Sequence, residues 1–479
     1  MLSALPRAVV ALRMRIFAVV NGDEGIRVPG PLVGPERFRA VYSHPAANGR
    51  SRGAGLSDLF WYWLAPGPQV HQEHLEAGQR YDAVARTTRR FLARPKGELT
   101  ELTERCTRRI LDELDRERSM REPGGRLIRL RDLMMPIWAE IYYELVFAEP
   151  CPAQARALVV GNATDVITAL KCCGLRHMER RERLTDHLRT RLTTGGLAHP
   201  LPAELSAQEQ VWYVQGTFFN TAVVQMSEAM THLLLAIAQH PDVQARLVAH
   251  PDDDAYADQV IDETLRCFPL FGIAHRITTD QIVVDERTTL PAGSVLCFNY
   301  PAYHALPGDE GGPPSPQLRS RAVDQPERFD PDRWGELAHR DAHHIPFGVQ
   351  ANRPCPARGI APAMMRVVAR EVLRRYALYS TATHTRSIPN RGPCLLVSRD
   401  LPSDPSDPSD PSDERRRTSA LARMRARDQW EDVWRSLIQL VLGTFMVLDA
   451  RHQRLCQRYF ESVDALTSTG MGARKEWTS

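Results

Sequence analysis

The sequence predicts a mainly α-helical protein with small β-sheets, built around one long central helix and followed by a C-terminal helical extension. Three observations support this fold class. Helical periodicity dominates from about residue 76 to 250, short strand-like segments follow between 275 and 300, and an amphipathic helix returns at 360–378. With 479 residues, the chain is long enough for one large domain with a substantial core.

Composition places the chain among soluble globular proteins, with 43% hydrophobic and 25% charged residues. The formal net charge is only +3, so we expect neither a nucleic-acid partner nor a membrane partner. Nine scattered cysteines without a CxxC pair indicate a reducing compartment. Arg13 and Arg15 interrupt the apolar N-terminal stretch, which argues against a signal peptide. We therefore expect a cytoplasmic protein.

The predicted elements run in a clear order. Amphipathic helices are expected at 80–93 and 102–117, followed by the central helix at 209–239. This segment of 31 residues contains no proline and would span about 45 Å. A helix so long and apolar should run through the middle of a domain rather than over its surface. The strand-like segments after it are "HRITT" (275–279), "QIVVDE" (281–286) and "SVLCFNY" (294–300).

The composition changes near residue 400. "SDPSDPSDPSD" (403–413) is an acidic, proline-punctuated repeat with nothing to bury, typical of an extended linker. We therefore divide the chain into a main domain (1–400), a linker (401–413) and a small helical extension (414–479). About 65 residues make a marginal independent domain, so the extension is expected to dock on the main body or on a partner. A solvated tail is the alternative.

Four features relevant to the chemistry of the protein follow one another in a fixed order. After the central helix comes "ETLR", whose Glu263 and Arg266 lie three apart and share a helix face. Then come "DQPERFDPDRW" (324–334) and the basic, proline-rich loop "HHIPFGVQANRPCPARG" (343–359) around Cys355. Singly, these features are a surface ion pair, a turn and a core thiol. Their order and spacing point to one shared cause.

This order resembles the cytochrome P450 family of haem-thiolate enzymes over about residues 60–400. The resemblance implies a cytochrome P450-like fold, of a divergent bacterial type, with the central helix over a haem b cofactor. It also implies a buried structural network beneath the haem, formed by Glu263, Arg266 and the PERF arginine, Arg328. The cysteine loop would then supply the iron ligand.

Within that resemblance, Cys355 corresponds to the thiolate that ligates the haem iron. A thiolate needs nearby positive charge, and Arg353 lies two residues before it. Further haem contacts implied by matching positions are Arg86 in "DAVAR", Arg276 in "AHRIT", His304 in "YHAL" and Phe347 in the cysteine loop. The loop departs from the family pattern in four ways: Phe347 stands eight residues before the cysteine instead of seven, Ala351 and Ala357 replace glycines, and Pro354 precedes the cysteine.

The central helix departs from the family as well. Members that split O₂ usually carry an acid–threonine pair there, and counting back from "AQHP" (238–241) puts Val224 and Gln225 at those positions. Valine cannot transfer a proton, and an amide is a poor acid. Thr221, one turn earlier, is a candidate for ordering water, as are Asn220 and Glu228. Protons then arrive by another route, or O₂ is not activated in the common way.

The resulting functional hypothesis is a monooxygenase-type oxidoreductase that hydroxylates, epoxidises or similarly oxidises a small intermediate of secondary metabolism. It would use O₂ and electrons from a ferredoxin with its reductase or a similar donor, since the chain has no flavin- or nicotinamide-binding glycine fingerprint. Two alternatives stay open. One is a haem-thiolate enzyme that uses peroxide or catalyses a non-redox rearrangement; the other is a haem-free interaction partner of a biosynthetic enzyme.

Overall fold

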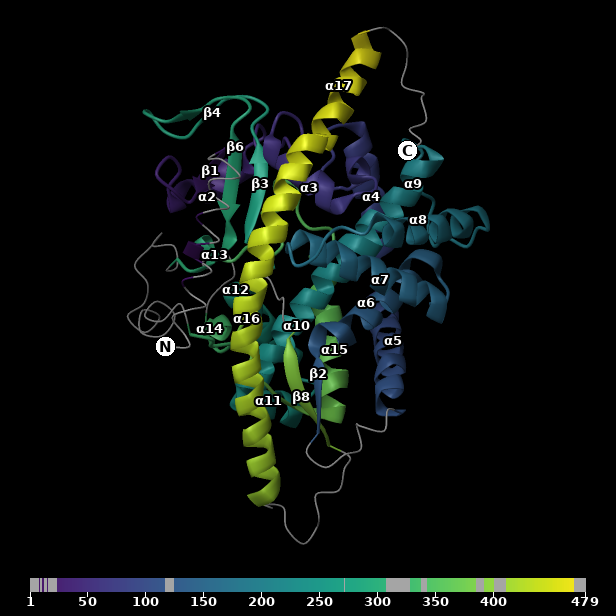
Figure 1. Cartoon of the computed structure of the whole chain (residues 1–479), viewed down its shortest axis with the longest axis vertical. Helices are drawn as coiled ribbons and strands as arrows, with labels where there is room; N and C mark the ends of the chain where they lie inside the picture. The colour runs from purple at the N-terminus through teal and green to yellow at the C-terminus, as the bar shows by residue number, and fades with distance from the viewer. Residues whose placement is uncertain are drawn as a thin grey trace.

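The computed structural model describes residues 24–116, 125–270, 272–306, 328–336, 343–384, 392–399 and 411–468, besides four isolated positions nearer the N-terminus. Most of these residues are helical and the strands are short, which confirms the predicted fold class (Figure 1). The first helices are α2 (Phe38–Ser43), α3 (Gly55–Leu64), α4 (Gln79–Leu92), α5 (Lys96–Arg116), α6 (Leu130–Phe147), α7 (Ala153–Leu170) and α8 (Met178–Thr193), with short 3₁₀ turns η1 (Pro35–Arg37) and η2 (Pro68–Val70). The later ones are α11 (Pro241–Ala249), α12 (Asp254–Cys267), α13 (Tyr300–His304), α14 (Arg333–Glu336) and α15 (Ala361–Arg375).

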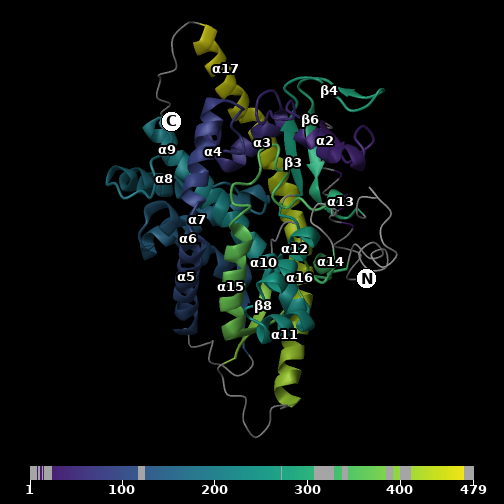
Figure 2. The same ribbon diagram turned by 180° about the vertical axis from the view of Figure 1, so that it is seen from behind.

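One helical rod runs through the middle of the molecule from Ala207 to Gln239 (Figures 1 and 2). It consists of α9 (Ala207–Val214), the π-helical segment η4 (Gln215–Ala222) and α10 (Val223–Gln239). Ser206 and Glu209 form a capping box that starts it, each side chain accepting from the other's backbone N–H. The rod is apolar enough to cross a membrane, but 83% of its most apolar window is buried within the protein. The predicted central core helix is confirmed.

The π-helical segment η4 brings a loop close to the rod. A Cβ atom added to Gly216 would lie only 2.0 Å from Nε2 of His71, so only glycine permits this approach. His71 follows η2, in the loop that leads to α4. π-helical turns inside α-helices occur frequently at functional sites. The π-helical segment Gln215–Ala222 is therefore a candidate functional region of the rod.

Small β-sheets of two or three strands accompany the helices. β1 (Gly25–Val28) pairs in parallel with β6 (Val295–Asn299), and β3 (Ile273–Ile277) pairs antiparallel on the other side of β6. The predicted segments 275–279 and 294–300 correspond to β3 and β6. The remaining strands are β4 (Ile282–Val283) with β5 (Thr289–Leu290), and β2 (Arg126–Arg129) with β8 (Pro393–Ser398) and β7 (Tyr376–Tyr379).

The C-terminal extension forms α16 (Pro411–Gln453) and α17 (Leu455–Ser468), which run along one face of the body (Figure 1). Seen from the opposite side, the body lies in front of them (Figure 2). The Tyr62 hydroxyl donates to Asp449 at 2.7 Å, and Nε2 of Gln439 donates to the carbonyl of Lys171 at 2.8 Å. The extension thus docks on α3 and on the loop after α7. Residues 401–410 of the expected linker lie outside the described part of the chain.

Candidate functional site

Cys355 lies in the loop that leads into α15. Its N–H donates to the carbonyl of Phe347 at 3.0 Å, and its carbonyl accepts from the N–H of Arg358 at 3.2 Å. The loop contains two residues with positive φ, Gly348 at 75° and Arg353 at 50°. Glycine adopts this conformation freely, whereas an L-residue there costs about 1 kcal/mol or more. The contacts of the Arg353 side chain must therefore hold this loop in place.

Three arginines gather beside this loop: Arg50, Arg276 on β3, and Arg353. Burial, together with the charges of Arg276 and Arg353, lowers the pKa of Arg50 to about 9. Burial and the charge of Arg276 also lower the pKa of Arg353 to about 10. Nε of Arg50, Nε of Arg276 and Nη2 of Arg353 are buried and have no hydrogen-bond partner among the described residues. Buried cationic donors without acceptors are costly unless an anion completes them.

The other donors of these arginines are fixed. Nη1 of Arg353 donates to the carbonyl of Leu75 at 2.6 Å, and its guanidinium lies 4.0 Å above the ring of Tyr81. Nη2 of Arg276 donates to the hydroxyl of Tyr42 at 3.0 Å. Because each guanidinium is anchored on one side, its unpaired donor keeps a defined direction. The cluster is therefore a preorganised cationic site next to the Cys355 loop.

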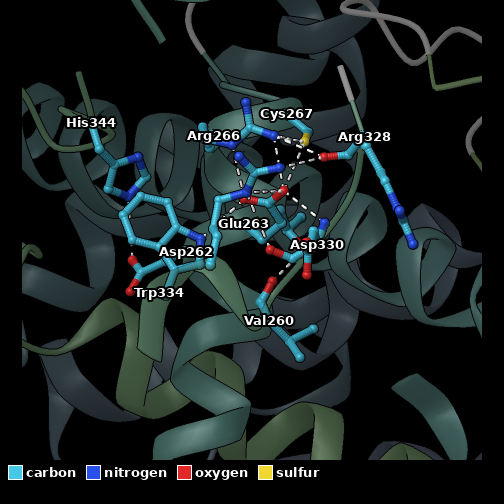
Figure 3. A network of polar contacts seen from close by, with 11 residues as sticks. Val260, Asp262, Glu263, Arg266, Cys267, Arg328, Asp330, Trp334 and His344 are labelled. Carbon is cyan, nitrogen blue, oxygen red and sulfur yellow. Dashed lines mark hydrogen bonds and ion pairs between the residues drawn. The ribbon is translucent and has the colours of Figure 1, made fainter. Parts of the chain in front are cut away.

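A second arginine cluster surrounds Glu263 on α12 (Figure 3). Nε and Nη2 of Arg266 each donate to its carboxylate at 2.8 Å, and Nε of Arg333 donates at 3.1 Å. The indole N–H of Trp334 donates at 3.0 Å and the backbone N–H of Asp330 at 2.8 Å. All five donors converge on one fully buried carboxylate. This arrangement satisfies the charges internally and links α12 to the segment at 328–336.

The second arginine of this network differs from the prediction. Arg333 contacts Glu263, whereas the Arg328 side chain is exposed and points away (Figure 3). Arg328 contributes only its carbonyl, which accepts from Arg266 at 3.1 Å and from Arg333 at 2.9 Å. The reason is visible in the sequence, because the pattern proline–acid–arginine–aromatic occurs twice, at 326–329 and at 331–334. The prediction used the first copy, and the second one makes the ion pair.

The candidate catalytic residues of the central rod lie at the junction of η4 and α10. Val224 is buried in the main hydrophobic core. Thr221 and Gln225 are half-buried, and neither side chain forms a hydrogen bond within the described part of the chain. Because η4 is π-helical, Thr221 is rotated relative to its place in a regular α-helix. None of the three is placed by the described contacts against Cys355, so their catalytic roles stay a prediction.

Two further polar residues of the rod are engaged elsewhere. Glu228 forms an ion pair with Arg131 and lies 3.6 Å from Nζ of Lys171. Asn220 accepts a hydrogen bond from the amide of Asn162. Glu228 therefore has a structural role in joining α6 and α10.

Comparisons with known proteins agree with this geometry. The family model "Cytochrome P450" matches residues 198–402, which include the central rod, the Glu263 network and the Cys355 loop. The putative cytochrome P450 135B1 of Mycobacterium tuberculosis is 33% identical over 194 residues, 37% of this chain and 37% of its own length. Residues 198–402 of this chain thus match the cytochrome P450 family.

Two further proteins resemble this chain. The cyclooctat-9-en-7-ol 5-monooxygenase of Streptomyces melanosporofaciens is 26% identical over 192 residues, 36% of this chain and 39% of the relative. The match thus spans less than two fifths of these curated relatives. A solved 6-coordinated cytochrome P450 from Thermus thermophilus aligns with a TM-score of 0.54 at 18% identity, over 74% of this chain and 91% of that one. That likeness confirms the cytochrome P450-like fold.

The family implies a haem cofactor, and the residues present fit one. A haem carries iron and two propionate carboxylates, and the site pairs the Cys355 sulfur with three arginines whose unpaired donors need an anion. Burial raises the pKa of the free Cys355 thiol to about 11, although the N–H groups of Ala357 and Arg358 oppose this effect. Iron binding must therefore displace the thiol proton.

The other predicted haem contacts fall in different places. Arg276 and Arg353 belong to the arginine cluster, and Phe347 contributes the carbonyl that fixes Cys355. His304 is buried, and its Nε2 accepts from the N–H of Ile345 at 3.1 Å, so it positions the start of the cysteine loop. Arg86 lies on the exposed face of α4. The described contacts bring neither His304 nor Arg86 to the arginine cluster.

Sequence reasoning missed Arg50 and Arg333. Arg50 lies in "NGRSRGAG" (48–55), an irregular segment in which no periodicity or motif distinguishes one arginine from the next. Its Nη1 donates to the carbonyl of His275 at 2.9 Å, so tertiary pairing with the strand carrying Arg276 brings it to the site. Arg333 had a usable signal, the second PDRW copy of the motif.

Proposed function

We propose that this protein is a haem-thiolate monooxygenase that oxidises a small biosynthetic intermediate, with O₂ and with electrons from a separate donor such as a ferredoxin. The observation that carries the proposal is that Cys355 lies in a loop beside three arginines, each of which keeps one buried donor without a partner among the described residues. A thiol alone is usually a core residue, and a cationic cluster alone suits many anions. Together they suit a group with one metal and two carboxylates. The monooxygenase name of a relative supports the reaction class.

The residues of this chain have distinct roles in the proposal. Cys355 would hold the iron of haem b, and Arg50, Arg276 and Arg353 would hold its propionates. The bound haem supplies the oxygen-activating chemistry, which inserts one oxygen atom into the substrate. In this proposal Val224, an apolar residue of the rod, would exclude water and give the substrate a hydrophobic contact. Gln225 and Thr221 are free to orient a polar substrate group or a water molecule.

A second candidate is a haem-thiolate enzyme that uses peroxide or catalyses a rearrangement. It is favoured by the rod, where Val224 occupies the core and Glu228 is held by Arg131 and Lys171. No acidic side chain is therefore available near Thr221 and Gln225 among the described residues of η4 and α10. A proton from the substrate or from ordered water would be required.

The decisive experiment is the absorption spectrum of the reduced protein with carbon monoxide. We expect a Soret band at the long wavelength typical of thiolate ligation, and its loss in Cys355→Ser. Cys267→Ser is the matched control, because this thiol lies beside the Glu263 network, 3.7 Å from its carboxylate. A thiolate-type band that persists in Cys355→Ser would refute the ligand assignment. A well-folded protein that binds no haem would favour an interaction partner of a biosynthetic enzyme.

Turnover separates the two enzymatic candidates. The monooxygenase proposal expects product formation with O₂, NADPH, a surrogate ferredoxin and its reductase. Product formed only with hydrogen peroxide, or without any oxidant, would support the second candidate. The printed names of two relatives, a pentalenene oxygenase and a cyclooctat-9-en-7-ol 5-monooxygenase, suggest pentalenene and cyclooctat-9-en-7-ol as the first panel of substrates. These compounds test the reaction class rather than assign the natural substrate.

A further inference from the structure

The outer face of α16 carries a continuous stripe of large apolar side chains. Their exposed fractions range from 41% to 68%. They are three pairs separated by eleven positions, close to three full turns of an α-helix, so they stay on one line along its axis. The stripe extends about 27 Å from its first to its last residue. Its members are Trp430, Trp434, Leu437, Val441, Phe445 and Leu448.

The opposite face of α16 is fixed to the body, so the helix cannot turn this stripe inward. Met446, Val447 and Ala450 are buried in a cluster with Leu59 and Tyr62 of α3. The Asp428 carboxylate accepts from the N–H of Thr383 at 2.8 Å, which ties the first half of the helix to the segment after β7. The helix is long and apolar enough to cross a membrane, and only 33% of its most apolar window is buried within the protein. Its attachment instead makes it lie flat along the surface.

Charges are distributed unevenly along this helix. Between 433 and 448 the only charged residue is Arg435, which is paired with Asp432 at 2.9 Å. Exposed arginines stand before and after the stripe. They are Arg423, Arg425 and Arg427 on the N-terminal side and Arg451 and Arg454 on the C-terminal side. An apolar centre with arginines at both ends and tryptophans near one end is typical of a helix that lies in a lipid interface.

This charge pattern argues against a second copy of the chain as the occupant. A parallel pairing of two stripes would place each terminal arginine beside the same arginine of the second chain. An antiparallel pairing about the midpoint of the stripe, residue 439, would place the arginines before the stripe opposite those after it. Of these, Arg427 is paired with Glu431 at 2.8 Å, so Arg423 and Arg425 carry the repulsion. Like charges in contact are destabilising in either arrangement. Phosphate groups of an anionic lipid surface, by contrast, would complement the arginines at both ends.

We propose that the outer face of α16 binds an anionic membrane surface. The six apolar side chains would enter the boundary between headgroups and acyl chains, and the flanking arginines would contact lipid phosphates. This inference stands apart from the proposed enzymatic function, because it uses no residue of the haem site. It replaces the expectation, drawn from the low net charge, that the protein has no membrane partner. The net charge of the whole chain gives no information about a local apolar stripe flanked by arginines.

The test is sedimentation of the full-length, haem-loaded protein with sucrose-filled vesicles. One vesicle set contains phosphatidylcholine alone and the other contains about one third phosphatidylglycerol, at physiological salt. We expect binding to the anionic vesicles, and at least a tenfold lower partition coefficient for the double variant Trp434→Ser/Phe445→Ser. Arg423→Gln should lower it about fivefold on anionic vesicles only, since each surface arginine contributes about 1 kcal/mol there.

Val283→Ser is the matched control, because Val283 on β4 is 66% exposed but lies away from α16 (Figure 1). It should bind like the wild type, and circular dichroism should show that all variants are folded. Wild-type protein that stays in the supernatant with both vesicle sets would overturn the proposal. So would stripe variants that bind as well as the wild type. Light scattering identifies the case in which a second copy covers the stripe, as a dimer that the double variant dissociates.

Discussion

The two arginine clusters of this protein differ in whether their charges are satisfied within the protein. Around Glu263, two guanidiniums, an indole and a backbone N–H all donate to one carboxylate. Beside Cys355, burial and the charge of Arg276 lower the pKa values of Arg50 and Arg353, and the three guanidiniums leave three buried donors without acceptors among the described residues. Closed networks of the first kind stabilise a fold, whereas open ones of the second kind need a ligand. The contrast separates structural from binding arginines without any reference to relatives.

The largest expected effect is the removal of Glu263. In Glu263→Ala, Arg266 and Arg333 would be left as buried charges without a counterion. We expect the free energy of unfolding to fall by about 3–5 kcal/mol, measured by urea denaturation. Glu98→Ala is the control, because the Glu98 side chain is 61% exposed and lies 3.9 Å from its partner Arg94; it should change stability by less than about 0.5 kcal/mol. Equal losses in the two variants would contradict the role of the network.

A second comparison distinguishes the two arginines of the repeated motif. Arg333→Ala removes a buried guanidinium from Glu263, and we expect a loss of about 2–4 kcal/mol in unfolding free energy. Arg328→Ala removes an exposed side chain but keeps the backbone carbonyl that accepts from Arg266 and Arg333. It should cost less than about 0.5 kcal/mol. The reverse order would restore the original assignment of Arg328.

These positions show what the sequence could and could not predict. The long apolar rod and the Glu263–Arg266 pair depend on local spacing, and the sequence predicted both. The role of Cys355 as the iron ligand stays a prediction. Arg333 was missed because the motif occurs in two adjacent copies. The sequence does not show which copy places its arginine against Glu263 on α12. Arg50 depends on tertiary pairing with the strand of Arg276, to which no local pattern corresponds. The π-helical turn at Gln215–Ala222, where Gly216 lies against His71, also escaped prediction.

A third set of buried groups stays uncharged, and it predicts how acid affects stability. Burial, followed by the charge of the neighbouring His232, lowers the pKa of His384 to about 3. Below about pH 6.5 the unfolded chain binds a proton that the folded chain refuses, so stability is lost as pH falls toward 3. His384→Gln should reduce the slope of unfolding free energy against pH by up to about 1.4 kcal/mol per pH unit between pH 6 and 4. His452→Gln, an exposed control on α16, should leave the slope unchanged.

The smallest expected change in stability, and the sharpest test of the comparison, is Arg50→Met. Burial in the folded protein lowers the pKa of Arg50 from its ordinary value to about 9, so its charge costs stability at every pH below about 9. We expect the haem-free variant to be as stable as the parent or more stable by about 1 kcal/mol, unlike Arg333→Ala. Haem should nevertheless be held about tenfold less tightly, measured by its transfer to apomyoglobin. Arg52→Met, whose side chain is 52% exposed, is the control; equal haem retention by both variants would remove Arg50 from the haem site.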